Sequence, residues 1–131
     1  MGNDRVILLD TCALLWLAQG STRISAGALA AIDSEPIVSV SAVSAFEICL
    51  KQQAGKLSLP LPAEEWWDRA IAHHRLEVID LDSRVLMRST RLPPIHRDPA
   101  DRFIIATALD HRAPVVTADK RFVAYGVRVL L

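Results

Sequence analysis

Short apolar runs that alternate with helix-like stretches are the feature of this sequence that most constrains its fold. The run Val6–Leu9, within RVILLD, is continuously apolar, as expected for a strand covered on both faces. Five segments of this kind are expected to be strands: Arg5–Asp10, Pro36–Ser41, Arg75–Leu81, Ala113–Asp119 and Gly126–Leu131. Six helical patterns separate them: Thr11–Gly20, Ile24–Ser34, Ser41–Gly55, Pro62–His74, Asp82–Leu92 and Asp98–Arg112. This alternation predicts an α/β fold with a mainly parallel sheet of about five strands and helices on both faces.

The composition is that of an ordinary globular protein. The 131 residues are expected to form one domain spanning residues 1–131, with 51% hydrophobic and 23% charged residues and a formal net charge of zero. The beginning MGNDRVILLDTC lacks the pattern of a signal peptide, and the chain has no run long enough to span a membrane, so we expect a cytoplasmic protein. Its two cysteines, Cys12 and Cys49, are expected to be small reduced residues rather than a disulfide framework.

Two acids follow predicted strands. Asp10 closes the first apolar run, and Asp119 comes shortly after Val115–Thr117. The carboxyl ends of parallel strands form the ligand-binding edge of an open sheet, so both acids are expected at the same edge. Taken singly, each acid is equally well explained as a helix cap or a turn residue.

A third acid, Glu47, lies at the edge of an apolar stripe. Val43, Phe46 and Leu50 repeat at helical spacing, and Glu47 stands four residues after Val43. Lys51 follows four residues later, so a surface ion pair is the simpler interpretation of Glu47 alone.

The fourth acid, Asp101, is less easily explained. Ile104 and Ile105 stand three and four residues after it, which puts Asp101 on the apolar face of its helix. Asp98 fits the helix N-cap with Pro99 at the first helical position, and an acid at Asp101 then suits the first turn. Capping explains the presence of an acid there, but it does not explain why Asp101 faces inward.

Taken together, the four acids indicate a metal site. Two carboxylates about 4 Å apart repel each other by roughly 4 kcal/mol at an effective dielectric constant near 20. A cluster of them requires raised pKa values or a bound cation, and oxygen ligands suit Mg²⁺ or Mn²⁺. Such a site is typical of metal-assisted phosphodiester hydrolysis.

Four segments that carry these acids resemble the motifs of PIN-domain ribonucleases, and of VapC-type toxins from toxin–antitoxin pairs in particular. They are LLDTCALLWL, SAFEICLKQQAGKL, HRDPADRFIIATAL and VTADKRF, in the family's order between Leu8 and Phe122. The resemblance implies a three-layer α/β/α fold and Mg²⁺- or Mn²⁺-dependent cleavage of RNA. It also implies inhibition by a cognate VapB-type antitoxin, and commonly a homodimer.

The resemblance also assigns roles to residues. The metal-binding and catalytic acids that it implies are Asp10, Glu47, Asp101 and Asp119. Asp119 is expected to hold or orient the metal, and Asp98 to act as a cap or in the outer shell. Thr11 and Thr117 match small hydroxyl residues beside the acids. Cys12 is a departure, because close relatives often have histidine there.

Other polar and aromatic residues are open to two interpretations. Arg97, Arg102, Lys51, Lys56, Lys120 and Arg121 are candidates for phosphate contacts or are ordinary surface charges, with the better case for Arg102 because it directly follows Asp101. The four histidines, His73, His74, His96 and His111, lack metal-ligand spacing and are expected to be surface or packing residues. Core or interface positions are expected for Trp16, Trp66 and Trp67.

Two other functions remain open from the sequence. A phosphohydrolase with Asp10 as nucleophile would also place an acid after the first strand, although the common second acid at position 12 is replaced by Cys12. The remaining alternative is a non-catalytic protein-binding module whose acids only cap helices.

Overall fold

The computed structural model describes residues 6–130 and shows a five-stranded parallel sheet in the order β3-β2-β1-β4-β5. Its strands are β1 (Val6–Leu9), β2 (Ile37–Ser41), β3 (Glu77–Ile79), β4 (Val115–Val116) and β5 (Val129–Leu130). All five predicted strands and the parallel arrangement are therefore confirmed. The predicted strand ends at Arg5 and Leu131 lie outside the described residues.

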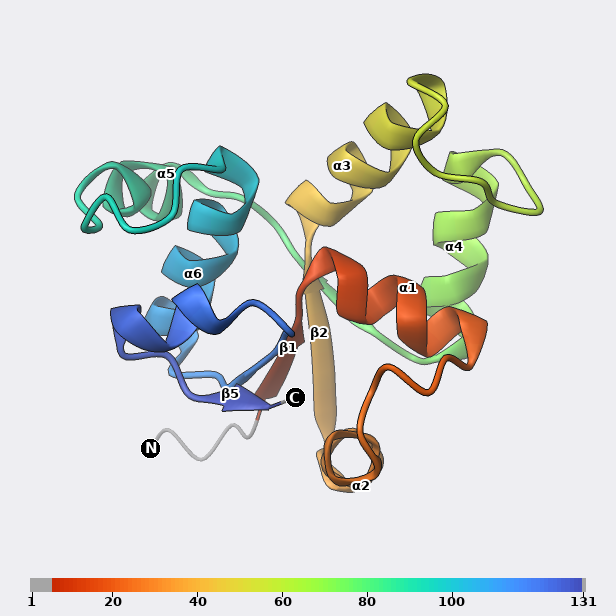
Figure 1. Cartoon of the computed structure of the whole chain (residues 1–131), viewed down its shortest axis with the longest axis horizontal. Coiled ribbons are helices and arrows are strands. Elements are labelled where there is room, and N and C mark those ends of the chain that lie inside the picture. Colours follow the sequence, from red (N-terminus) through yellow and green to blue (C-terminus); the bar gives the residue numbers. More distant parts are fainter. Residues whose placement is uncertain (1–5, 131) are drawn as a thin grey trace.

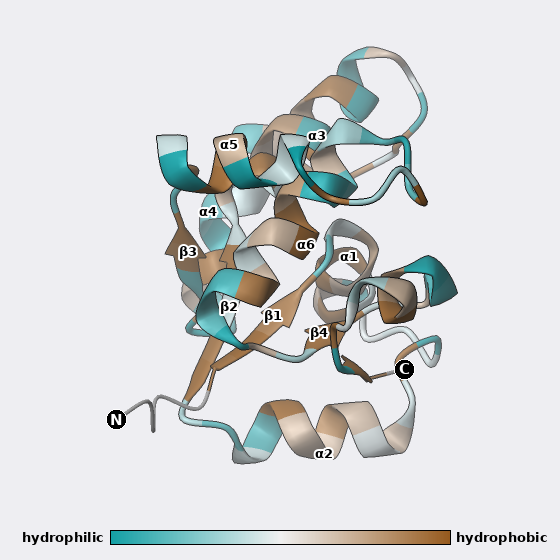
Figure 2. Ribbon diagram, turned by 90° about the vertical axis from the view of Figure 1, so that its left-hand side faces the viewer, coloured by the Kyte–Doolittle hydropathy of each residue, from teal (hydrophilic) through white to brown (hydrophobic). Residues whose placement is uncertain are grey.

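Helices cover both faces of this sheet, which gives the predicted three layers (Figure 1). Their bounds are α1 (Thr11–Gln19), α2 (Ala26–Ser34), α3 (Ala42–Gln53), α4 (Ala63–His73), α5 (Ser83–Thr90) and α6 (Pro99–His111). Ile7 and Leu9 of β1 pack with residues of α1, α2 and α4, whereas Leu8 faces the opposite core with Ile104 and Ile105 of α6. The alternating faces of β1 thus join two cores, and the apolar colour of β1 and β2 in Figure 2 shows why both faces need cover.

Polar side chains cap the starts of several helices, including the cap expected from the sequence at Asp98. The side chains of Ser25 and Asp82 cap α2 and α5 by accepting backbone N–H groups. Asp98 caps α6 in the same way, with Pro99 at its first position. No helix in the described part of the chain is long and apolar enough to cross a membrane.

The segment after β4 differs from the prediction. Strand geometry ends at Val116 instead of continuing to Asp119, and a 3₁₀ helix, η1 (Lys120–Tyr125), follows. Asp119 caps η1 by accepting the Arg121 N–H, and Gly126 ends it in the left-handed conformation at φ 81°. The cap formed by the Asp119 side chain therefore turns the chain before strand pairing can extend beyond Val116.

Arg102 holds the loop between α5 and α6 rather than facing the sheet edge. Its Nη1 donates to the carbonyls of Pro93 and His96 at 3.0 and 2.9 Å. Its Nη2 donates to the carbonyls of Ser89 and Leu92 at 2.7 and 2.9 Å. Both terminal nitrogens of the guanidinium are therefore used by backbone acceptors, which favours a structural role for Arg102 over the phosphate contact considered from the sequence.

We expect Arg102→Lys to lower the free energy of unfolding by about 2–4 kcal/mol, because an ammonium cannot reach several divergent carbonyls and leaves them unpaired. Urea unfolding of the variant measures this, with Arg91→Lys at an exposed position as the matched control. Unchanged stability combined with weakened RNA binding would return Arg102 to the role of a phosphate contact.

Candidate metal centre

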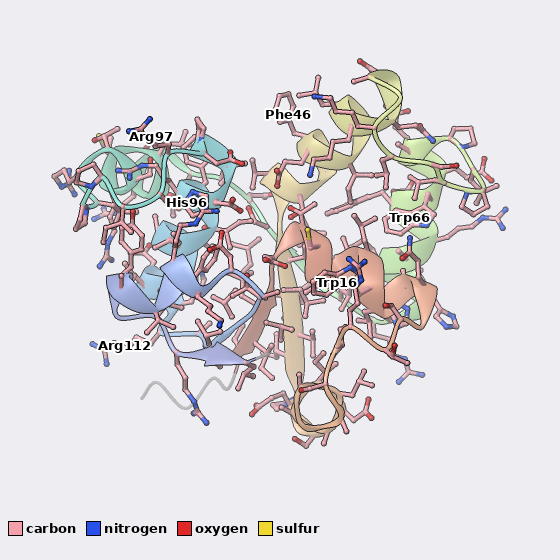
Figure 3. The ribbon with its side chains drawn as sticks, viewed as in Figure 1. Trp16, Phe46, Trp66, His96, Arg97 and Arg112 are labelled. Carbon is pink, nitrogen blue, oxygen red and sulfur yellow. The ribbon has the colours of Figure 1, made fainter. Side chains whose placement is uncertain are left out.

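A cleft of about 320 Å³ lies at the carboxyl end of the central strands, and all four acids expected from the sequence line it: Asp10, Glu47, Asp101 and Asp119. The rest of its lining is Thr11, Cys12, Trp16, Lys51, Asp98 and Ala118. In Figure 3, Trp16 on α1 and His96 beside α6 lie on opposite sides of the central strands. The structure therefore brings together acids that are up to 109 positions apart in the sequence.

Asp10 is the most buried of these acids, with 6% of its surface exposed. It caps α1 by accepting the Ala13 N–H at 2.8 Å. Burial raises the pKa of its carboxyl, the Thr117 hydroxyl and the Ala13 N–H oppose that shift, and Glu47 and Asp119 add to it. Thr117 also accepts the Asp119 N–H at 3.0 Å, so this predicted hydroxyl residue connects two of the acids.

Glu47 is held by the other predicted hydroxyl residue. The Thr11 hydroxyl donates to Glu47 Oε1 at 2.5 Å and lies 2.8 Å from the Ser44 hydroxyl. Because the single Thr11 proton goes to the carboxylate, Ser44 donates to Thr11. Ser44 precedes Glu47 by three residues on α3, and sequence analysis did not identify it.

Asp101 lies in the first turn of α6, with 23% of its side chain exposed. Burial raises the pKa of this carboxyl to about 7, and Asp98, Glu47 and Asp10 add to the shift while His96 opposes it. An acid with such a pKa is one whose charge is not yet compensated by its surroundings. Asp98 is exposed and lines the same cleft, but its Oδ1 caps α6 through the Ala100 N–H at 3.0 Å.

Asp119 has the opposite environment. Its Oδ1 accepts the Arg121 backbone N–H at 3.0 Å and Arg121 Nε at 2.9 Å, and its Oδ2 accepts Arg121 Nη2 at 2.7 Å. His96 Nε2 lies 2.8 Å from the same Oδ2. The Arg121 guanidinium holds the pKa of the Asp119 carboxyl well below its usual range. The negative charge of the fourth acid is thus already balanced by a cationic side chain, unlike the charges of Asp10 and Asp101.

His96 was interpreted from the sequence as a surface or packing residue, and the structure confirms the packing role but adds contacts with two of the acids. Its ring is 3% exposed and packs edge-on against Phe122, but its Nε2 also lies 3.1 Å from Asp101 Oδ2 and 2.8 Å from Asp119 Oδ2. Ligand atoms of these three residues all fall within 4.8 Å of one another. Sequence spacing gave no signal for this, since the histidine meets Asp119 across 23 positions.

The predicted cationic and aromatic residues divide into those near the cleft and those away from it. Lys51 lines the cleft, and Arg121 binds Asp119 at its edge. Exposed positions are occupied by Lys56, Arg97 and Lys120. Trp66 is 8% exposed, and Trp16 and Trp67 are partly buried against the same core, which confirms the expected packing role of all three tryptophans.

Comparisons with known proteins agree with this architecture. Residues 7–127 match the PIN domain family. Ribonuclease VapC22 of Mycobacterium tuberculosis (strain ATCC 25618 / H37Rv) is 31% identical over 116 residues, which is 88% of each chain.

Solved structures show the same fold at lower sequence identity. A chain of VapBC2 from Rickettsia felis, bound to a DNA fragment from its promoter, superposes with a TM-score of 0.70 at 15% identity, covering 95% of this chain and 96% of that one. A toxin–antitoxin complex from Klebsiella pneumoniae gives 0.65 at 20% identity, covering 95% and 96%. The family match over most of the chain, the curated relative and the shared fold lead to one conclusion: this chain belongs to the PIN-domain family.

Proposed function

We propose that this chain is a divalent-metal-dependent endoribonuclease toxin of the VapC type, acting as one nuclease domain over residues 1–131. The observation that carries the proposal is the convergence of four carboxylates, from four separate segments, in one cleft at the carboxyl end of the sheet. Membership of the PIN-domain family and the likeness to a protein named as a ribonuclease support it.

The donor set fits Mg²⁺ or Mn²⁺. Carboxylate oxygens from Asp10, Glu47 and Asp101 are hard ligands, and burial has raised the pKa of both aspartates. A cation would remove that cost by compensating their charge. We therefore assign these three acids to hold the metal and Asp119, already paired with Arg121, to orient the site from beside it.

The chain's own residues would position the substrate and the water around this centre. A bound divalent cation supplies a lowered pKa for an attacking water and neutralises charge on the phosphate. Lys51 lines the same cleft, and this supports it as a contact for an RNA phosphate. The helix N-terminus at Asp10 adds partial positive charge on the same side as the acids.

The proposed partners follow from the relatives. The structural neighbours include complexes named as toxin–antitoxin pairs, which supports a VapB-type antitoxin as the inhibitor of this chain. We also propose a cytoplasmic homodimer. Exposed apolar side chains on α3, Phe46 at 62% and Leu50 at 51%, provide surface for a protein contact.

RNA cleavage with Mg²⁺ or Mn²⁺ tests the activity. We expect Asp10→Asn and Asp101→Asn each to reduce the rate at least about 100-fold, because each removes a charged metal ligand. Asp33→Asn, at an exposed position on α2, is the matched control, and EDTA should abolish cleavage by the wild type. Cleavage that persists in both site variants would contradict the assignment, and a trapped phosphoryl group on Asp10 would instead identify a phosphohydrolase.

Metal-free stability should fall as the pH rises from 4 to 7. The pKa of Asp101 is raised from 3.8 in the unfolded chain to about 7 in the folded one, so the folded state binds more protons in this window. The loss should reach about 2–4 kcal/mol at pH 8 and be absent in Asp101→Asn. Urea unfolding at pH 5 and pH 8 in EDTA measures it as the difference between wild type and variant. If the stability of wild type and Asp101→Asn changed equally with pH, the pKa of the Asp101 carboxyl would not be raised by folding.

Arg121→Gln should tighten Mn²⁺ binding by about 3- to 10-fold, because it removes a cation that competes for the acids. Isothermal titration calorimetry with Mn²⁺ measures the change, and Arg128→Gln, an exposed arginine away from the cleft, is the control. Weaker binding in Arg121→Gln would mean that the arginine is needed to hold Asp119 in place.

A further inference from the structure

We propose that His96 is a positioning residue whose Nε2–H holds the carboxylates of Asp101 and Asp119 side by side, rather than a ligand of the metal. This inference rests on the proposed function, because it concerns the same cation site. It goes beyond the four-acid assignment by adding an N–H donor that two of the acids share.

The contacts on both ring nitrogens identify the tautomer. The Asp98 backbone N–H donates to His96 Nδ1 at 3.3 Å, so Nδ1 carries a lone pair and no proton. The ring proton is then on Nε2, which faces Asp119 Oδ2 at 2.8 Å and Asp101 Oδ2 at 3.1 Å. In the opposite tautomer, the Nδ1–H would face the Asp98 N–H, so that two donors would meet. The lone pair of Nε2 would then face two carboxylate oxygens.

The same contacts explain how two acids from different elements remain close. Asp101 comes from α6 and Asp119 from the start of η1, and without a donor between them their Oδ2 atoms would repel each other. One N–H shared by both oxygens removes part of that repulsion. The Oδ1 atom of Asp101 takes no part in this contact and remains available to a cation in the cleft that Asp101 lines.

The backbone on either side of the ring is fixed independently. The Tyr125 hydroxyl accepts the His96 N–H at 2.7 Å, and Arg102 Nη1 donates to the His96 carbonyl at 2.9 Å. The ring itself is buried against Phe122. His96 is thus held at its backbone N–H, at its backbone carbonyl and at the face of its ring. A residue held in this way has little freedom to move its ring toward a metal, which favours positioning over ligation.

The decisive experiment combines spectroscopy of the wild type with two variants. A long-range ¹H–¹⁵N correlation spectrum of the metal-free wild type should show His96 with its proton on Nε2. Pulsed electron paramagnetic resonance of the Mn²⁺-loaded wild type should show no ¹⁴N coupling from a bound imidazole. Either a proton on Nδ1 or a directly bound nitrogen would overturn the proposal, and neither result depends on a variant folding.

The variants test the role of the shared donor. His96→Gln keeps an N–H donor at about the same reach and should bind Mn²⁺ within about threefold of the wild type, whereas His96→Leu should bind at least about tenfold more weakly. His111→Gln, at the exposed end of α6, is the control. A folded His96→Leu with unchanged Mn²⁺ affinity would show a purely structural histidine. Failure of the wild type to bind Mn²⁺ or cleave RNA would instead overturn the proposed function, and it leaves the tautomer measurement as a separate result.

Discussion

The structure depends on the cost of gathering carboxylates at one buried edge of the sheet. The backbone offsets part of this cost before any ligand is considered, because Asp10, Asp101 and Asp119 lie at helix starts where peptide dipoles favour negative charge. Asp10 caps α1, Asp98 caps α6, and Asp101 lies in the first turn of α6. Capping and clustering are therefore not alternatives, since the caps are what make the cluster tolerable.

The remaining charge is distributed unevenly across the cleft. Asp119 accepts donors on both of its oxygens, and its pKa is lowered by Arg121. Within residues 6–130, neither Asp10 nor Asp101 is paired with an arginine or lysine, and burial raises the pKa of each. A cation would be bound most favourably beside Asp10 and Asp101, whose negative charge is not compensated. Asp119, whose charge is already compensated by Arg121, is better suited to orient the site. This difference assigns separate roles to acids that look equivalent in the sequence.

The parts of this arrangement that the sequence predicts are those determined by local chemistry. Alternating strands and helices, the cap at Asp98, and the acids at Asp10, Asp101 and Asp119 all follow from patterns within a few residues. Arg102 shows the limit of such reasoning. Adjacent helical residues point about 100° apart, so the residue after an inward-facing Asp101 is directed away from the cleft. The polar role of His96 was missed because Asp119, 23 positions along the chain, meets it only after the chain has folded.

Arg102 and His96 belong to one structural unit. Arg102 binds carbonyls of the loop between α5 and α6, including that of His96, and His96 in turn contacts Asp101 and Asp119. Arg102 and Asp101 are neighbours on α6, so one turn of helix supplies both an acid and the cation that fixes the loop around it. The acids determine which chemistry this cleft can perform. The loop determines how closely the acids approach one another, and so residues that touch neither metal nor RNA are expected to set the geometry of the site.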